Sequence, residues 1–135
     1  MAVIKGRCEC GRVRYEVDAE ISDFSHCHCS QCRRLHGAAF ASFAAVPRDE
    51  FRYLSGGPDL KIYASSDQID RVFCAHCGSN ILADYKPEPD VLYLTMGTID
   101  GEPKCPPGYH IFVGSKAPWY EICDALPQHD GVPEN

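Results

Sequence analysis

Residues 27–32 read Cys27-His28-Cys29-Ser30-Gln31-Cys32, which places three thiols within six positions. Two further cysteine pairs lie far from this stretch along the chain, Cys8/Cys10 and Cys74/Cys77. A glycine follows each of these pairs directly, at positions 11 and 78, and the central three cysteines are not followed in this way. This asymmetry divides seven of the nine cysteines into a set of four and a set of three.

The composition limits the class of protein. A chain of 135 residues is long enough for one domain with a modest core. The net charge of −6 at pH 7 argues against a nucleic-acid partner, because such partners usually meet a basic face. No apolar run is long enough to span a bilayer, and residues 1–6 lack the apolar segment of a signal peptide. We therefore expect a cytoplasmic protein with no membrane or nucleic-acid partner.

Alternating apolar residues predict an all-β domain. Val13, Tyr15 and Val17 alternate with polar residues over 12–18, and 38–46 is nearly all apolar. Further strands are predicted at 60–64, 71–74, 80–85, 91–96 and 109–113, with a helical turn at 47–51 and a closing helix at 119–126. In that helix Trp119, Ile122 and Leu126 should face inward. Residues 1–127 are expected to form the single domain, and residues 128–135 a polar tail that frays.

The two glycine-marked pairs together supply the four ligands of a structural zinc site. A glycine after the second cysteine permits a positive φ, which turns backbone amides toward the thiolate sulfur. In the reducing cytoplasm disulfides are rare, and an odd number of cysteines cannot form a closed set of them. Two alternatives stay open: unrelated pairs of buried thiols, or a zinc ribbon that joins Cys29/Cys32 to Cys74/Cys77.

If the four-cysteine set closes one site, Cys27, Cys29 and Cys32 remain as three ligands with an open fourth position, the pattern of a catalytic zinc. A thiolate-rich zinc suits a thiol as fourth ligand, and its chemistry favours addition of a thiol to a carbonyl or the reverse cleavage. The alternatives are a third structural site completed by His26, His28 or His110, and a redox-active Cys29/Cys32 pair. The redox motif normally begins a helix after a strand, which is not expected here. The side chains of His28 and His76, inside knuckles, should point outward.

The motifs resemble those of the glutathione-dependent formaldehyde-activating (GFA) enzyme family, which also includes centromere protein V. The matching segments are 6–11, 27–33, 37–40, 71–79, 97–100, 110–111 and Trp119, in family order. The resemblance implies a β-tent fold of several coiled antiparallel sheets and two zinc ions per chain. It implies that Cys8, Cys10, Cys74 and Cys77 hold the structural zinc and that Cys27, Cys29 and Cys32 hold the catalytic one.

The activity that the resemblance implies is that of a carbon–sulfur lyase of the S-(hydroxymethyl)glutathione synthase type. Its partner would be a small-molecule thiol such as glutathione, with the thiolate at the open zinc position and formaldehyde or a related small aldehyde as the second substrate. Arg33 suits a carboxylate of that thiol, or else it is a surface charge or offsets the zinc–thiolate centre. His110 suits a proton donor or fourth ligand, or else it is a core histidine. The alternative function is a non-catalytic, zinc-stabilised binding module.

Overall fold

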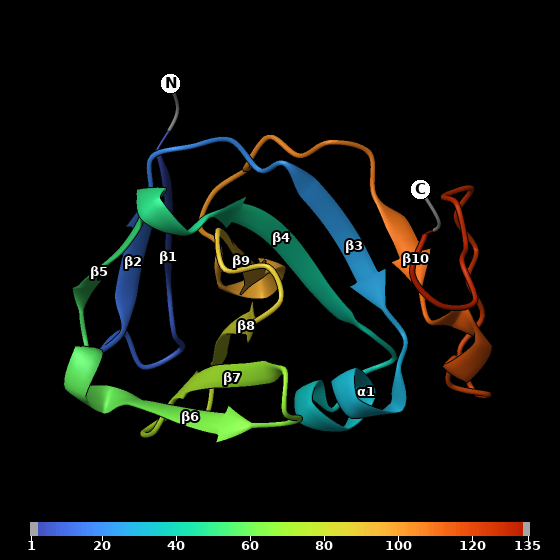
Figure 1. Cartoon of the computed structure of the whole chain (residues 1–135), viewed down its shortest axis with the longest axis horizontal. Helices are drawn as coiled ribbons and strands as arrows, with labels where there is room; N and C mark the ends of the chain where they lie inside the picture. The colour runs from blue at the N-terminus through green and yellow to red at the C-terminus, as the bar shows by residue number, and fades with distance from the viewer. Residues whose placement is uncertain (1–2, 134–135) are drawn as a thin grey trace.

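Two β-sheets form the fold in this computed structural model, which describes residues 3–133 (Figure 1). The strands are β1 Ile4–Arg7, β2 Arg14–Val17, β3 Asp23–Cys27, β4 Ala41–Pro47, β5 Phe51–Ser55, β6 Leu60–Ala64, β7 Ile69–Cys74, β8 Asn80–Tyr85, β9 Val91–Thr95 and β10 Tyr109–Ile111. The helices are α1 Ser30–His36 and the single 3₁₀ turns η1 Arg48–Glu50, η2 Gly57–Asp59, η3 Met96–Thr98 and η4 Val113–Ser115. The predicted all-β class is confirmed.

The smaller sheet has the order β1-β2-β5, and the larger has the order β10-β3-β4-β9-β8-β7-β6. Neighbouring strands are antiparallel except for β10, which runs parallel to β3 with Tyr109 opposite Ser25. The chain crosses between the sheets three times, from β2 into β3, from β4 back into β5, and from β5 through η2 into β6 (Figure 1). β10, which comes late in the chain, thus lies at one edge of the large sheet beside β3, which comes early.

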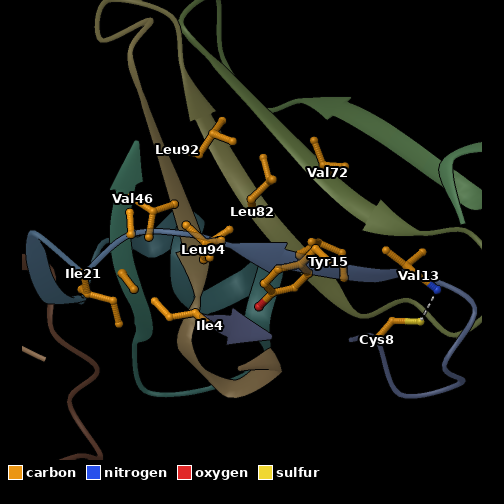
Figure 2. Packing of buried hydrophobic residues seen from close by; sticks show 14 of the residues in the cluster. Ile4, Cys8, Val13, Tyr15, Ile21, Val46, Val72, Leu82, Leu92 and Leu94 are labelled. Atoms are coloured by element: carbon orange, nitrogen blue, oxygen red, sulfur yellow. Dashed lines mark hydrogen bonds between the residues drawn. The ribbon is translucent and has the colours of Figure 1, made fainter. Parts of the chain in front are cut away.

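The main core draws apolar side chains from both sheets (Figure 2). Tyr15 of β2 and Leu94 of β9 are fully buried in it. The Tyr15 hydroxyl forms a hydrogen bond with Thr98 Oγ1 at 2.7 Å, so the polar end of this ring is satisfied inside the protein. Because successive side chains of a strand point to opposite faces, the large sheet keeps its other face for a second, smaller cluster. That cluster contains Cys27, Cys32, Ala41, Phe43 and Ala83.

The C-terminal segment departs from two expectations. The helix predicted over 119–126 is wrong: the segment is irregular and the Trp119 side chain is 70% exposed. The prediction of a frayed end is also wrong for the described part, because backbone groups of Pro127, His129 and Gly131 bond to the end of β10. Contacts with β10, which lies about 10 to 20 residues earlier in the chain, outweigh the helical spacing of the apolar residues. Residues 134–135 lie outside the described residues.

The remaining helix, α1, was not predicted. Its N-cap is Cys29, whose Sγ accepts the backbone N–H of Cys32 at 3.3 Å, and its C-cap is Gly37 in the left-handed conformation. Within residues 3–133, no helix has the length and apolarity that a membrane span requires.

Gly6 is the point where the small sheet approaches η3 most closely. A Cβ there would lie against the Tyr15 ring and 2.6 Å from the Thr98 carbonyl oxygen. We expect Gly6→Ala to lower the free energy of unfolding by about 2–3 kcal/mol, because the core must shift to make room. Urea denaturation measures the change. Gly97→Ala is the matched control, since a Cβ at Gly97 meets nothing within 4 Å; an equal loss in both variants would contradict this account.

Candidate metal centres

The four glycine-marked cysteines meet at one point. Cys8 and Cys10 come from the turn between β1 and β2, Cys74 is the last residue of β7, and Cys77 lies in the turn between β7 and β8. Their sulfur atoms all lie within 4.8 Å of one another, with Cys8–Cys10 at 3.5 Å and Cys10–Cys74 at 3.8 Å. A tetrahedral site with zinc–sulfur bonds of about 2.3 Å separates its sulfurs by roughly 3.8 Å, so the donor set fits zinc. The group joins one turn of each sheet.

Backbone geometry around this group follows the expectation from the glycines. Gly11 and Gly78 have φ values of 81° and 80°, in the left-handed region. The backbone N–H of Val13 donates to Cys8 Sγ at 3.3 Å, a contact drawn in Figure 2. The two glycine amides themselves bond to the carbonyl oxygens of Cys8 and Cys74. Each turn is thus closed by its glycine, and the amide that reaches the Cys8 sulfur comes from a later residue.

The donors around Cys77 favour its thiolate. Burial opposes ionisation, but hydrogen bonds with the Ser79 hydroxyl and with the backbone of Cys10 and Ser79 outweigh it and lower the pKa of Cys77 to about 5. Ser79 also connects the two turns directly, because its Oγ accepts the backbone N–H of Glu9 at 2.9 Å. A cluster that already favours a thiolate is the chemistry that a cation requires of its ligands.

The other three cysteines form a second group at the end of β3 and the start of α1. The sulfurs of Cys27, Cys29 and Cys32 lie within 4.8 Å of one another, and no other His, Cys, Asp or Glu of residues 3–133 completes this group as a fourth member. Hydrogen bonds from Cys27 and Cys32 lower the pKa of Cys29 to about 2, and the same contact with Cys29 raises that of Cys27. Three charges this close repel one another, so all three thiols ionise together only around a cation.

Arg71 is a site residue that the sequence did not reveal. It lies on β7, its side chain is almost fully buried, and its Nη2 is 3.6 Å from Cys32 Sγ. The same nitrogen donates to Gln31 Oε1 at 3.0 Å, and Nε donates to Ser65 Oγ at 3.2 Å. A buried arginine that contacts a thiol supplies a fixed positive charge beside the three-cysteine group. In the sequence it resembles an ordinary polar position at the start of an apolar run.

A cavity of about 990 Å³ opens beside the three-cysteine group, on the face of the large sheet away from the main core. Asp23, Ser25 and Cys27 line it at alternate positions of β3, as the pleat of a strand requires. Arg71 and all three cysteines of the group also line this cavity. The volume is in the range of pockets that bind small molecules. The remaining polar lining includes Glu88, Tyr93 and Tyr109.

Two carboxylates of this cavity are each held by a tyrosine. The Tyr109 hydroxyl donates to Asp23 Oδ2 at 2.6 Å, and the Tyr93 hydroxyl donates to Glu88 at 2.7 Å. Burial, then the contact with Glu88, raises the pKa of Tyr93, and the charge of Asp23 adds to this effect. The Asp23–Tyr109 and Glu88–Tyr93 pairs therefore form one acidic region of the cavity. The cationic Arg71 lines the same cavity.

The structure places the other candidate residues elsewhere. Arg33 on α1 and His110 on β10 do not line the cavity, so their substrate roles stay predictions. His28 is fully buried, against the expectation that it points outward, whereas the side chain of His76 is 45% exposed. None of the three histidines proposed to complete a third structural site, His26, His28 and His110, joins the three-cysteine group.

Two open alternatives are also addressed by the geometry. The ribbon partition is not the observed one, because Cys29/Cys32 and Cys74/Cys77 belong to different groups. The pair Cys29/Cys32 does begin a helix directly after a strand, but the fold around it is all-β rather than the α/β context typical of the redox motif, and all nine cysteines are free thiols. The two cysteines outside both groups are Cys105, which is half-buried in a loop, and Cys123, which is exposed.

Residues 3–115 match the family model described as glutathione-dependent formaldehyde-activating enzyme. The chain belongs to this family. A putative glutathione-dependent formaldehyde-activating enzyme of Halomonas elongata is 27% identical over 127 residues, covering 89% of this chain and 81% of the relative. An uncharacterized lyase of Schizosaccharomyces pombe is 28% identical, over 63% of this chain and 60% of its own length.

Two further comparisons give one more relative and one solved structure. A putative glutathione-dependent formaldehyde-activating enzyme of Podospora anserina is 31% identical over 58% of this chain, which spans only 37% of that longer protein. A structural-genomics crystal structure of a Rhodobacter sphaeroides protein superposes with a TM-score of 0.62 at 27% identity. The superposition covers 73% of this chain and 89% of the Rhodobacter sphaeroides chain.

We expect Cys77→Ser to remove most of the free energy of unfolding, which for a domain is about 5–15 kcal/mol, because one of four ligands joining the two sheets is lost. Thermal unfolding followed by circular dichroism measures this. Cys123→Ser is the control, since this exposed thiol belongs to neither group. A native-like melting curve for Cys77→Ser would contradict a structural role for the four-cysteine group.

Proposed function

We propose that this protein is a two-zinc, carbon–sulfur lyase-type enzyme that acts on a thiol adduct of formaldehyde or a related small aldehyde. The observation that carries the proposal is the three-cysteine group, which lies in the wall of a cavity large enough for a thiol-containing peptide. The names of the relatives from Halomonas elongata and Podospora anserina point to glutathione as that thiol. We assign the four-cysteine group to a structural zinc and place the protein in the cytoplasm.

The proposed reaction joins a thiol and an aldehyde without oxidation or reduction. A carbon–sulfur bond forms as the carbonyl π bond opens, and the thiol proton ends on the former carbonyl oxygen; the reverse direction breaks the same bond. A zinc ion bound by three thiolates supplies a Lewis acid that favours the thiolate form of an incoming thiol.

The chain itself contributes charge and position. Arg71, fixed by Gln31 and Ser65, places a permanent positive charge beside the three thiols. That charge favours both an incoming thiolate and the oxygen that becomes negative as the carbon–sulfur bond forms. The apolar side chains of Phe43 and Ile111 line the same cavity and limit access of water to this region.

The acidic region of the cavity suits the ammonium group of the thiol substrate. Asp23 and Glu88 offer carboxylate oxygens whose orientation is fixed by Tyr109 and Tyr93. Asp23 and Cys27 are four residues apart on β3, which corresponds to about 13 Å along a strand. A thiol peptide with a free amino group on the residue before its cysteine, such as glutathione, can extend its ammonium group from a sulfur near Cys27 along the cavity toward Asp23.

The first test counts the metal. We expect about two zinc ions per chain after purification under reducing, chelator-free conditions, and we expect glutathione to perturb one of them. Cys29→Ser should fold, retain one zinc and lose both the response to glutathione and thiol-dependent turnover. A wild-type protein with one tightly held zinc that ignores glutathione would favour the non-catalytic binding module instead.

The second test concerns the amino end of the thiol. We expect the double variant Asp23→Asn, Glu88→Gln to bind glutathione about 10-fold more weakly, because two charged hydrogen-bond acceptors are lost. Binding of N-acetylglutathione, which has no ammonium group, should be unchanged. Isothermal titration calorimetry measures both. Glu20→Gln, an exposed acid outside the cavity, serves as control; equal weakening for both thiols would exclude ammonium recognition.

A further inference from the structure

A chain of three hydrogen-bonded side chains lies behind the three-cysteine group and takes no part in the proposed reaction. His110 Nε2 lies 3.0 Å and 3.1 Å from the two carboxylate oxygens of Asp124. His110 Nδ1 lies 2.8 Å from Nε2 of His28. Both imidazoles are buried, with exposed fractions of 0% for His28 and 1% for His110, while the Asp124 side chain is 45% exposed.

The hydrogen bonds fix the direction of donation. A carboxylate only accepts, so His110 donates to Asp124 through its Nε2–H. A neutral His110 then accepts at Nδ1, and His28 donates to it through its own Nε2–H. The remaining nitrogen of His28, Nδ1, is buried and has no partner among the described residues. The contact with His110 is therefore the one hydrogen bond that the His28 ring makes within residues 3–133.

His28 stands between two proposed metal ligands, Cys27 and Cys29. Its backbone N–H donates to the carbonyl oxygen of Ile111 at 3.0 Å, and its ring bonds to the neighbouring His110, so β10 holds it by backbone and side chain together. The ring also packs against Phe40, with centroids 4.9 Å apart. These contacts fix the backbone and the ring of the residue that lies between the two cysteines.

Asp124, at the exposed end of this hydrogen-bonded series, is held by the backbone as well. Asp124 Oδ1 accepts the backbone N–H of Leu126 at 3.0 Å, which orients the carboxylate toward His110. Beyond it, the backbone N–H of His110 donates to the Pro127 carbonyl oxygen at 2.8 Å, and the N–H of His129 donates to the His110 carbonyl oxygen at 3.0 Å. The C-terminal segment is thus attached to β10 at the same residue that contacts His28.

We propose that Asp124 and His110 are positioning residues that hold the Cys27–Cys29 loop in its ligating geometry, so that the C-terminal segment sets the metal affinity of the three-cysteine group. The inference rests on the proposed metal at that group. Loss of Asp124 frees the His110 ring to turn, and a turned His110 leaves the buried imidazole of His28 without a hydrogen bond. The loop then relaxes to satisfy that ring, and the three sulfurs separate.

The test uses the full chain loaded with Co²⁺, whose thiolate charge-transfer bands report metal–sulfur bonding, together with competition by a chromophoric chelator. Asp124→Ala should weaken the more labile of two sites by about 10–100-fold, the effect usual for residues that orient metal ligands. The tighter site and the thermal unfolding temperature should stay close to wild type, because the replaced side chain is exposed. Asp124→Asn should restore affinity in part, since its Oδ1 still accepts from His110 and Leu126.

Asp59→Ala is the matched control. It removes the other aspartate–histidine contact near a cysteine group, between Asp59 Oδ1 and His76 Nε2 at 2.6 Å, and should leave the labile site unchanged. Wild-type affinity at the labile site of Asp124→Ala would overturn the inference, and so would equal weakening of both sites or no recovery in Asp124→Asn. If the wild-type protein itself binds a single metal, the proposed function fails at the first step, and this result is distinct from the others.

Discussion

The convergence of Cys8 and Cys10 with Cys74 and Cys77 is the contact on which the arrangement of the two sheets depends. It joins the first hairpin of the small sheet to a hairpin of the large one. The main core lies between elements that these turns bring together, so its apolar packing and the thiol cluster support each other. Four ionised sulfurs at such separations require a cation between them, and a cation held there would join the two sheets.

The pleat of the strands places core side chains on one face of the large sheet and cavity side chains on the other. Alternate residues of β9 face the main core, where Leu92 and Leu94 are buried, while Tyr93 between them lines the cavity. β3 divides in the same way, with Asp23 and Cys27 toward the cavity and His28, just beyond its end, on the other side. Each strand therefore contributes to stability with one face and to the site with the other.

The sequence predicted what depends on local patterns and missed what depends on distant pairing. The strands over 60–64 and 80–85 were predicted with the bounds observed, because clear turn residues flank them. The short helix α1 was missed because a cysteine thiol replaces the usual serine or aspartate at its start. The helix expected over 119–126 fails because Asp124 is engaged by His110, and the cavity residue Arg71 was missed because its role arises only when β7 is paired in the sheet.

The parallel pairing of β10 with β3 has a consequence for the biogenesis of the protein. The ring contact between His28 and His110 joins residues 82 positions apart, so the three central thiols leave the ribosome long before the strand that supports them. Such a non-local contact forms late in folding. The nascent chain therefore passes through a stage in which its three central thiols are present without the strand that supports them, and in that stage they are accessible to oxidation and to metal ions.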